Sequence, residues 1–325
     1  MRKSKNLGNS LHSSKNSSKI LLSICVPVKN DLAVAREFVK QMAEQTEEPD
    51  EVIFVDGHST DGTYEYLVEA SKKYKWLRVE RQETEFITPA AARNQAVRHC
   101  RGEFVYILDA DIKLENDFIR KMKKELSKSK PHIFFFNVKS YPSIEYKSIW
   151  HKLFYWKDNA VGILKGGPLV IYRKDAFIFQ QDKYFYGEDR VCHNQLMEMV
   201  KERIVEHSKK TYWVSSKSVE SFKEAFNRYF KYGFTSPEFV FGLSKPIEKL
   251  KAIGGWLSIP FFPILIVGFA KGLYQTIVWR SFGWEVIFYP LIEPMIMVIF
   301  SLGFWSRVAH EFLRFFGLRK AWNKS

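Results

Sequence analysis

Cysteine is scarce in this sequence, and its scarcity excludes two kinds of scaffold. The chain of 325 residues contains three cysteines, Cys25, Cys100 and Cys192, and no two of them form a Cys-x-x-Cys pair. Neither a disulfide framework nor a cysteine-based zinc cluster is therefore expected, and a reducing, cytoplasm-facing location follows. Four histidines also lack a partner at the spacing of metal ligands and are expected to be surface or packed residues: His99, His132, His151 and His193.

Acidic residues are fewer than basic residues in this chain. Lys and Arg number 50 against 36 Asp and Glu, which gives a formal net charge of +14. Such a balance suits a nucleic acid, an anionic membrane surface or a substrate that carries phosphates. Much of the positive charge lies near the N-terminus and beside apolar segments near the C-terminus, where anionic lipid accounts for it. Nucleic acid is therefore not expected as a partner.

An export signal is also missing from the start of the chain. Residues 1–19 are basic and rich in Ser and Asn, with too few apolar side chains to pack, so we predict a disordered tail. The apolar run that follows, ILLSICVPV, stops at Lys29. It is too short for the hydrophobic part of a secretory signal with its cleavage site, and it is typical of a buried strand.

Between residue 20 and about residue 112, β-rich runs alternate with helical patterns. The expected strands are ILLSICVPV, EVIFVD, WLRVER and EFVYILD. The first intervening helix has Val34, Phe38 and Met42 at helical spacing, and Pro89 opens the third at a position where a helix tolerates proline. This alternation predicts right-handed βαβ units and a mostly parallel sheet. In such sheets, ligands bind beyond the carboxyl ends of the strands.

Three carboxylates fall at those strand ends. Asp56 follows EVIFV, while Asp109 and Asp111 follow EFVYIL. In an extended segment, residues two apart point the same way, so Asp109 and Asp111 would face one spot, and two negative charges there favour a cation. The alternatives are that these two acids cap the following helix, and that Asp56 only forms a turn leading into Gly57.

The composition changes after residue 250. Residues 252–270 contain no charge and residues 286–304 contain only Glu293, so each run is long enough to cross a bilayer as a helix. Tryptophans near the ends are typical of interface belts: Trp256, Trp279, Trp284 and Trp305. The alternative is a pair of buried or surface-lying helices, since prolines interrupt both runs: Pro260, Pro263, Pro290 and Pro294. Glu293 is either functional or a snorkelling or helix-breaking residue.

The charges around these runs predict an orientation. The connector holds Lys271 and Arg280, whereas the outer flanks hold more cations: Lys245, Lys249, Lys251, Arg307, Arg314, Arg319, Lys320 and Lys324. By the positive-inside rule, both the part before residue 250 and the C-terminus face the cytoplasm. We therefore expect a multi-pass protein of the cell membrane with its catalytic domain in the cytoplasm.

Four motifs occur in order along the chain. They are SICVPVKN, EVIFVDGHSTDGT, ARNQAVRHCRGEFVYILDADI and YFYGEDRVCHNQL. Together they resemble the inverting glycosyltransferases of family 2 over roughly residues 20–235. The resemblance implies a GT-A fold, the Rossmann-like, mostly parallel α/β sheet of nucleotide-diphospho-sugar transferases, followed by C-terminal membrane helices. The expected parts are a basic tail (1–19), the GT-A domain (20–235) and a membrane-associated region (236–325) with two spans and a basic C-terminal tail.

The resemblance also implies a donor site for a nucleotide-sugar, most often a UDP-sugar. Asp111 would bind Mn²⁺ or Mg²⁺, and Asp109 would help to hold the ribose and the metal. Such an ion would neutralise the donor's diphosphate as it leaves. Asp56 would accept a hydrogen bond from the base.

Three further residues match nucleotide-facing positions of the family. Pro27 and Asn30 match the loop after the first strand, and Arg93 matches an arginine that lies near the nucleotide. A cation suits the donor's charge, although an ordinary arginine on the surface of a helix is the alternative. Asp61 and Gly62 are expected to shape the turn before the next helix rather than to touch ligand.

The acceptor side is implied by two other segments. An inverting transfer needs a base for the acceptor hydroxyl, and by resemblance Asp189 is that base, with Glu188 as a supporting acid. The alternative is acidic decoration of a helix N-terminus. Gly166 and Gly167 lie where the family has an acceptor-side loop, and glycine allows backbone to approach a sugar closely.

The sequence departs from the processive members of the family. They have Gln-x-x-Arg-Trp in the segment that leads to the membrane, whereas this chain has Ala225, Arg228 and Tyr229. Ala96 also replaces a glycine that the family commonly has. We expect one sugar added per encounter to a lipid-linked or glycan acceptor, in the synthesis of a cell-envelope polysaccharide or glycolipid. The alternatives are a polyprenyl-phosphate sugar synthase and a catalytically silent membrane scaffold.

Overall fold

The computed structural model describes most of the first half of the chain and much of the remainder. The described residues are 22–127, 133–140, 150, 170–177, 179, 182, 188–204, 212–216, 219–240, 246–258, 264–278 and 288–315. The predicted tail over 1–19 and the glycines Gly166 and Gly167 lie outside these ranges.

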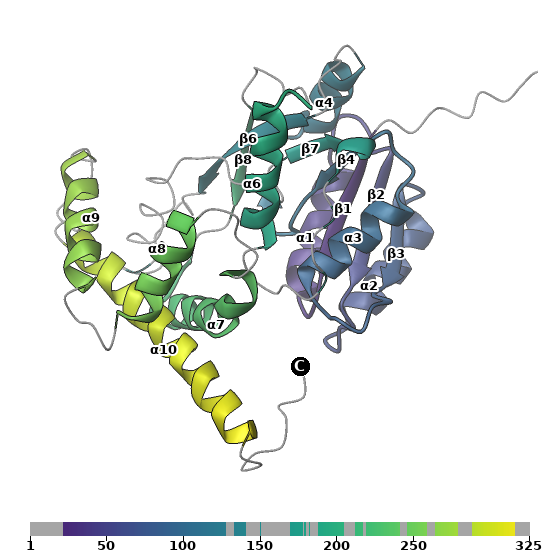
Figure 1. Ribbon diagram of the computed structural model, residues 1–325. Helices are drawn as coiled ribbons and strands as arrows, with labels where there is room; N and C mark the ends of the chain where they lie inside the picture. The colour runs from purple at the N-terminus through teal and green to yellow at the C-terminus, as the bar shows by residue number, and fades with distance from the viewer. Residues whose placement is uncertain are drawn as a thin grey trace, which may run out of the picture.

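The described strands form one sheet of eight in the order β3-β2-β1-β4-β7-β6-β8-β5 (Figure 1). Their bounds are β1 Leu22–Val28, β2 Glu51–Asp56, β3 Leu77–Arg81, β4 Phe104–Ile107, β5 Ile112–Lys113, β6 Ile133–Ser140, β7 Val170–Arg173 and β8 Tyr212–Ser216. The first four strands are parallel to their neighbours, while β4 pairs antiparallel with β7 and β7 with β6. The parallel half confirms the predicted βαβ alternation.

Helices cover this sheet at the positions where the sequence alternates. Their bounds are α1 Leu32–Ala43, α2 Thr63–Lys73, α3 Pro89–His99, α4 Phe118–Leu126 and α6 Glu188–Lys201, with a short 3-10 turn η1 at Lys174–Ala176. Helix α3 begins as predicted, because Pro89 occupies its first turn and the Thr88 hydroxyl accepts a hydrogen bond from the Ala91 N–H at 3.1 Å.

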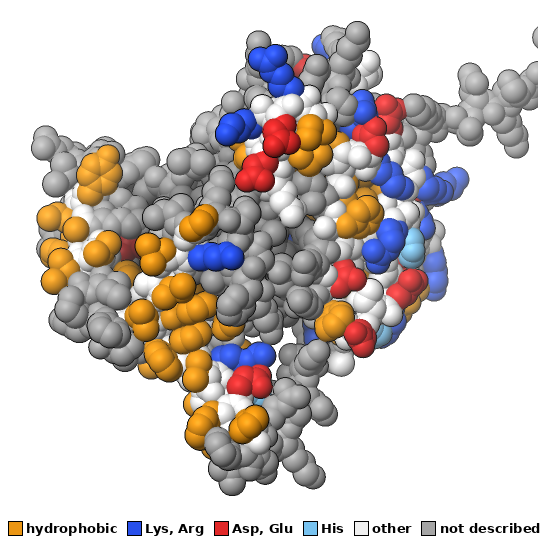
Figure 2. Space-filling view, in the orientation of Figure 1, with side chains coloured by type: hydrophobic (Ala, Val, Ile, Leu, Met, Phe, Trp, Pro, Cys, Tyr) orange, Lys and Arg blue, Asp and Glu red, His pale blue; other side chains and the backbone are white. Residues whose placement is uncertain are grey.

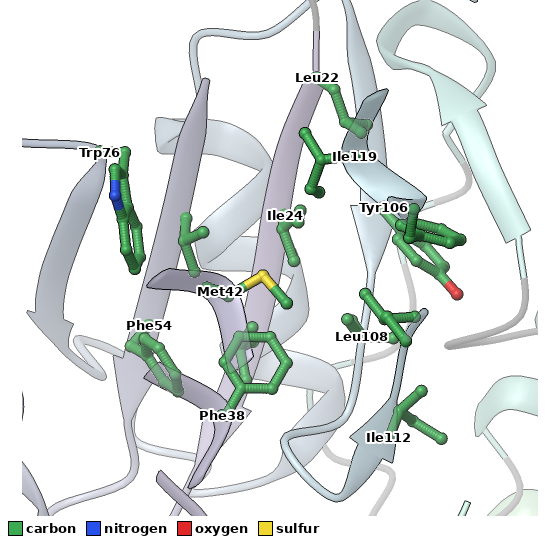
Figure 3. Packing of buried hydrophobic residues seen from close by; sticks show 14 of the residues in the cluster. Leu22, Ile24, Phe38, Met42, Phe54, Trp76, Tyr106, Leu108, Ile112 and Ile119 are labelled. Atoms are coloured by element: carbon green, nitrogen blue, oxygen red, sulfur yellow. The ribbon is translucent and has the colours of Figure 1, made fainter. Parts of the chain in front are cut away.

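The main core lies between the sheet and helices α1, α2 and α4, and Figure 3 shows part of it. Phe38 and Met42 of α1 are each 1% exposed, and Phe38 packs edge to face on Phe54 of β2 with 5.5 Å between ring centroids. Burial of one such side chain contributes roughly 1.5–3 kcal/mol to folding. This packing holds the strands in register and so fixes where their carboxyl ends lie.

The amino ends of the central strands are fastened by a buried acid, Glu51, the first residue of β2. Its carboxylate accepts hydrogen bonds from the Ser23 hydroxyl at 2.5 Å, the Arg78 guanidinium at 2.7 Å, and the backbone and side chain of Arg101 at 2.8 and 2.9 Å. Burial alone would raise the pKa of Glu51, but these hydrogen bonds outweigh it and lower the pKa below its usual value. The Ser23 hydroxyl also accepts from the Gly102 N–H at 2.8 Å.

In the described residues after β8 there are four helices: α7 Phe222–Val240, α8 Pro246–Trp256, α9 Ile264–Val278 and α10 Tyr289–Phe315. Helix α10 packs against the other three. Polar contacts connect them, since the Trp256 indole donates to the Ser236 hydroxyl at 2.7 Å and the Ser301 hydroxyl donates to the Trp256 carbonyl at 2.6 Å. Each buried serine is thereby hydrogen-bonded.

The predicted pair of spans differs from these helices. The run 252–270 is divided, because α8 ends at Trp256 and α9 begins at Ile264, with Pro260 and Pro263 between them in the sequence. Proline lacks the N–H that a helix interior needs, which is consistent with this break. The run 286–304 corresponds to α10, which starts later and extends to Phe315. Among the described residues, one helix is long and apolar enough to cross a membrane, Pro290–Leu313.

Large apolar side chains are exposed over α9 and α10 (Figure 2). On α9 they are Ile266, Val267, Phe269, Leu273 and Tyr274, and on α10 they are Leu291, Leu302, Trp305, Val308, Phe312 and Phe315. Contiguous apolar surface of this kind marks a contact with membrane or with another protein.

Candidate active site

Asp56 lies at the carboxyl end of β2 and is fully buried. One of its carboxylate oxygens, Oδ2, accepts a hydrogen bond from the Ser59 N–H at 3.0 Å, which is the turn-forming contact that the sequence allowed as an alternative. The other oxygen, Oδ1, is buried and has no hydrogen-bond partner among the described residues. A buried carboxylate oxygen without a partner is costly, so this atom is suited to accept an N–H from a ligand.

Asn30 joins the loops that follow β1 and β2. Its backbone has a φ of 51°, in the left-handed region that asparagine tolerates, and its N–H donates to the Ser59 hydroxyl at 2.8 Å. Its side-chain oxygen accepts from the Thr60 N–H at 2.8 Å. Pro27, one residue before the end of β1, pairs in register with Val55 beside Asp56. Both residues predicted for the nucleotide loop therefore lie near Asp56, and Asn30 organises the loop.

The turn before α2 is shaped by Asp61 and Gly62, as predicted. The Asp61 carboxylate accepts from the Leu32 N–H at the start of α1 and from the Thr63 hydroxyl at the start of α2, at 3.1 and 2.5 Å. These hydrogen bonds, led by that from Thr63, lower the pKa of Asp61. Gly62 adopts a φ of 91°, which residues with a Cβ rarely adopt. One acid thus joins the first turns of two helices at the edge of the site.

Gln82, just after β3, was not identified from the sequence. It is 4% exposed, its N–H donates to the Asp56 carbonyl at 2.8 Å, and its side-chain amide donates to the Phe86 carbonyl at 2.6 Å. Its own carbonyl contacts Nε2 of His58 at 2.9 Å. The available signal in the sequence was a glutamine directly after the predicted strand WLRVER. Gln82 fixes the loop between β3 and α3 beside Asp56.

Arg93 and Asp109 are brought together from α3 and the end of β4. The Arg93 guanidinium lies 3.0 Å from the Asp109 carboxylate, and the arginine side chain is 6% exposed. The alternative of an ordinary arginine on a helix surface is therefore wrong. A buried guanidinium next to an acid at the sheet edge provides a fixed positive charge in the site.

Asp111 lies two residues after Asp109, and its side chain is exposed to solvent although neighbouring protein atoms crowd its carboxylate. Burial first, and the charge of Asp109 second, raise the pKa of Asp111 to about 6, although the charge of Arg228 in α7 acts in the opposite direction. The two acids do not cap the next helix, because α4 begins at Phe118 after its N-terminal residue Asp117. They form instead a pair of mutually repelling carboxylates at one edge.

The predicted acceptor-side acids begin α6. Glu188 is its first residue and Asp189 its second, so both lie in the first turn, where the helix dipole favours acidic side chains. This position is compatible with a catalytic base and with helix decoration.

A further residue, Asp182, lies against α3 and was missed by the sequence patterns. Its carboxylate accepts from the Asn94 side-chain amide at 2.6 Å, and its carbonyl accepts from the Thr88 hydroxyl. Asn94 follows Arg93 directly and is 2% exposed. Asp182, six residues before the start of α6, is thus hydrogen-bonded to the helix that carries Arg93.

Two acids and a histidine form a second cluster of side chains that could bind a metal ion. Ligand atoms of Glu80, Glu83 and His99 lie within 4.8 Å of one another, although the spacing along the chain offered His99 no metal partner. Glu80 already contacts Nδ1 of His99 at 2.6 Å and the Arg78 guanidinium at 3.1 Å. These contacts satisfy the carboxylate, and they are typical of an ion-pair network rather than of a metal site.

Comparison with known proteins identifies the family. A model of glycosyl transferase family 2 matches residues 23–200, which is more than half of the 325 residues. The chain belongs to this family. This glycosyltransferase is 33% identical over 92 residues to the poly(ribitol-phosphate) beta-glucosyltransferase of Bacillus spizizenii. The aligned stretch covers 28% of this chain and 14% of the relative. Family membership confirms the enzyme class that the motifs predicted.

Other relatives of the glycosyltransferase are similarly distant. The putative teichuronic acid biosynthesis glycosyltransferase TuaG of Bacillus subtilis is 33% identical over 108 residues, or 33% of this chain and 41% of the relative. The matches thus span less than half the length of these two relatives. Among solved structures, the mannosyltransferase PcManGT of Pyrobaculum calidifontis, in complex with GDP-Man and Mn²⁺, has a TM-score of 0.54 at 16% identity and covers 87% of this chain and 86% of that one. This likeness confirms the GT-A fold.

Proposed function

We propose that this glycosyltransferase moves one sugar per encounter, with inversion at the anomeric carbon, from a nucleotide-diphosphate sugar to a lipid-linked or glycan acceptor at the membrane. The observation that carries the proposal is the convergence of three features at the carboxyl end of a parallel sheet: Asp56 Oδ1, which has no partner among the described residues, the ion pair of the buried Arg93 with the partly exposed Asp109, and Asp111. Ligands bind at this end of such sheets.

The donor would enter with its base at Asp56. The free oxygen would accept a ring N–H, and both uracil and guanine offer one. Uridine is proposed because the motifs resemble a family that usually takes UDP-sugars. Pro27 and the Asn30 loop would face the nucleotide, and Arg93 would hold Asp109 towards the ribose while adding positive charge beside the phosphates.

The acids at the end of β4 fit a divalent cation. Asp109 and Asp111 offer hard carboxylate oxygens from one edge, which suit Mn²⁺ or Mg²⁺. When bound, such an ion supplies Lewis-acid stabilisation of the leaving diphosphate. Asp111 is the proposed direct ligand, because Asp109 is already engaged by Arg93.

The acceptor hydroxyl would give its proton to Asp189 as it attacks, with Glu188 as a neighbouring acid. The hydrogen bonds from Asn94 and Thr88 to Asp182 support this assignment, because they connect the segment before α6 with α3. Gly166 and Gly167 are proposed for the acceptor-side loop on the strength of the family resemblance.

Membrane attachment is proposed through residues 236–325, with residues 20–235 as the transferase domain. Helix α10 has 27 residues and is about 40 Å long at 1.5 Å per residue, which exceeds a hydrocarbon core of about 30 Å. With α9 as a second crossing, the cation distribution would place the transferase domain and the C-terminus in the cytoplasm. Such a cell-membrane enzyme would serve the synthesis of an envelope polysaccharide or glycolipid.

Calorimetric titration of the detergent-purified protein tests the donor site. UDP and GDP are titrated with and without Mn²⁺ into the native protein, Asp111→Asn and the control Asp117→Asn, whose side chain pairs with Lys121 on α4. We expect metal-dependent binding of UDP that Asp111→Asn abolishes and Asp117→Asn keeps. Failure of the native protein to bind either nucleotide under both conditions would overturn the proposal.

A further inference from the structure

The start of α7 is fixed by its own first turn. The Ser221 hydroxyl accepts from the Glu224 N–H at 3.2 Å, and the Glu224 carboxylate accepts from the Glu220 N–H at 2.9 Å. This is a variant of the capping box in which the acid binds the N–H one residue before the N-cap serine. The other oxygen of Glu224 lies 3.5 Å from the Arg228 guanidinium one turn later. The first two turns of α7 therefore orient Arg228.

Electrostatic interactions connect this part of α7 with the carboxylate edge of the site. The positive charge of Arg228 lowers the pKa of Asp111, and the charge of Lys29, in the loop after β1, lowers that of Lys231, for which burial is the larger cause. Lys29 itself passes Gly57, since a Cβ at Gly57 would lie 3.3 Å from its side chain. Cations of α7 thus lie close to the loops that carry the proposed donor site.

The following part of α7 crosses α10 at two glycines. A Cβ added to Gly233 would lie 2.7 Å from the carbonyl carbon of Phe300, and one added to Gly303 would lie 2.8 Å from the backbone N of Phe234. Real Cβ atoms do not approach backbone this closely, so the helices meet at a separation that only glycine permits. The contact is reciprocal, since each helix presses its backbone on the glycine of the other.

The crossing lies close to Arg228 along α7. Gly233 is five residues further on, or about 7.5 Å at 1.5 Å per residue, so a movement of the crossing is transmitted to the arginine with little loss. By contrast, a Cβ at Gly254 in α8 would meet nothing within 4 Å. Gly254 is therefore a matched control for a glycine-to-alanine change among the same helices.

We infer that the Gly233–Gly303 crossing is a positioning device: it sets the depth of α7 on α10 and thereby holds Arg228 at the Asp109–Asp111 edge, where the donor's diphosphate would bind. The inference rests on the proposed function and assigns positioning roles to two glycines that touch no substrate. A Cβ at either position would force the helices apart, and a misplacement of about 1 Å can cost on the order of 100-fold in rate.

The test is a double-mutant cycle on nucleotide affinity in the full-length protein. Gly303→Ala, Gly233→Ala and the control Gly254→Ala are made in the native background and in Arg228→Gln, and the affinity for UDP with Mn²⁺ is measured by calorimetry. We expect Gly303→Ala and Gly233→Ala to weaken binding about tenfold in the native background and less than about twofold in Arg228→Gln, because coupled residues are not additive. Gly254→Ala should leave the affinity for UDP unchanged in both backgrounds.

Equal losses in both backgrounds, or no loss in either, would overturn the inference, because a merely structural role is independent of Arg228. If Gly303→Ala and Gly233→Ala fail to fold by circular dichroism, Gly255→Ala replaces them, since its Cβ would meet only the Phe300 ring at 3.3 Å. We then expect a loss of about two- to threefold that also disappears in Arg228→Gln. Absence of UDP binding by the native protein contradicts the proposed function, whereas normal binding by Arg228→Gln contradicts only this inference.

Discussion

Strand β2 begins and ends with a buried acid, and the two carboxylates differ in how completely they are hydrogen-bonded. Glu51 and Asp56 are both fully buried and five residues apart. Two arginines, a hydroxyl and a backbone N–H bind the carboxylate of Glu51, whereas Asp56 keeps one oxygen without a partner among the described residues. The amino end of the strand uses its acid to hold the fold, and the carboxyl end keeps its acid available.

The pKa values follow the same division. Hydrogen bonds and arginines lower the pKa of Glu51 despite burial, while burial and Asp109 raise that of Asp111 to about 6. Burial therefore does not decide the outcome by itself. The supply of hydrogen-bond donors decides it, led at Glu51 by the Arg101 N–H and the Ser23 hydroxyl. At the carboxyl end that supply is incomplete, as a site that binds a cation or a ligand N–H requires.

Removal of the Glu51 carboxylate should give the largest effect at the amino end. In Glu51→Ala, Arg78, Arg101 and the Ser23 hydroxyl lose their shared buried acceptor. Both arginines are partly exposed, so the loss is that of several hydrogen bonds to a charged group, at about 1.5–3 kcal/mol each, and we expect about 3–5 kcal/mol of unfolding free energy in total. Urea denaturation followed by circular dichroism measures this loss. UDP affinity of the folded fraction should stay normal, and a nucleotide-binding defect without a stability defect would break the comparison.

Asp56→Asn should instead weaken nucleotide binding and leave the stability of the fold almost unchanged. The amide replaces a poorly satisfied buried carboxylate, so we expect the unfolding free energy to change by less than about 1 kcal/mol. Loss of a charged acceptor for the base should weaken UDP binding by about 1.5–3 kcal/mol, the range for hydrogen bonds to charged groups. Calorimetry with UDP and with pyrophosphate, each with Mn²⁺, separates the base from the phosphates, because pyrophosphate binding should be unchanged. A variant that binds both ligands normally contradicts the role of Asp56.

The two ends should also respond to pH with opposite signs. The lowered pKa of Glu51 gives stability that is present above its unfolded value and is lost as pH falls through the lower folded value, so it disappears in strongly acidic solution. The raised pKa of Asp111 lowers the stability of the metal-free protein at neutral pH, and this penalty is relieved as pH falls through about 6 towards the unfolded value near 4.

Urea denaturation of the metal-free protein between pH 3 and pH 8 checks both signs. Asp111→Asn should remove the gain between about pH 7 and pH 4, and Glu51→Gln should flatten the loss below that range. A native profile with no gain between pH 7 and pH 4 would contradict the second assignment.

Asp182→Asn should give the smallest effect. The Asn94 amide would keep an oxygen acceptor only if the new side chain turns its carbonyl towards it, so we expect a stability loss of about 0.5–1.5 kcal/mol. Turnover should fall more than UDP affinity if this contact holds the acceptor side. A fall in UDP affinity alone would assign Asp182 to the donor side instead.

The sequence predicted the parts of this comparison that are local in the chain. Alternating strands and helices up to about residue 112, the three acids at strand ends and the proline that opens α3 all follow from patterns within a few residues. The partners of Glu51 could not be predicted, because Ser23, Arg78 and Arg101 reach it from three other segments. The pairing of strands β6 to β8 likewise depends on tertiary packing, whereas the division of the first apolar run follows from prolines that are visible in the sequence.

The candidate site shows the same limit. Asp109 and Asp111 are two residues apart in the sequence, so their shared edge was predictable, whereas the hydrogen bond between Asn94 and Asp182 joins residues 88 positions apart. Burial of Arg93 could not be read from α3 either, because the helix has small residues around most of its circumference. Long-range contacts of polar groups leave no periodic signal in the chain.

The continuity of α7 decides how this protein can be divided for experiment. The helix runs from Phe222 to Val240 without a break at residue 235, and Ser236 just beyond that point receives the Trp256 indole. A fragment ending at residue 235 would end inside a helix and separate Gly233 from the partner against which it is fitted. Solubility gained by deleting the apolar helices would therefore be obtained at the expense of a correctly placed Arg228, so the intact chain in detergent or lipid is the appropriate material for kinetic work.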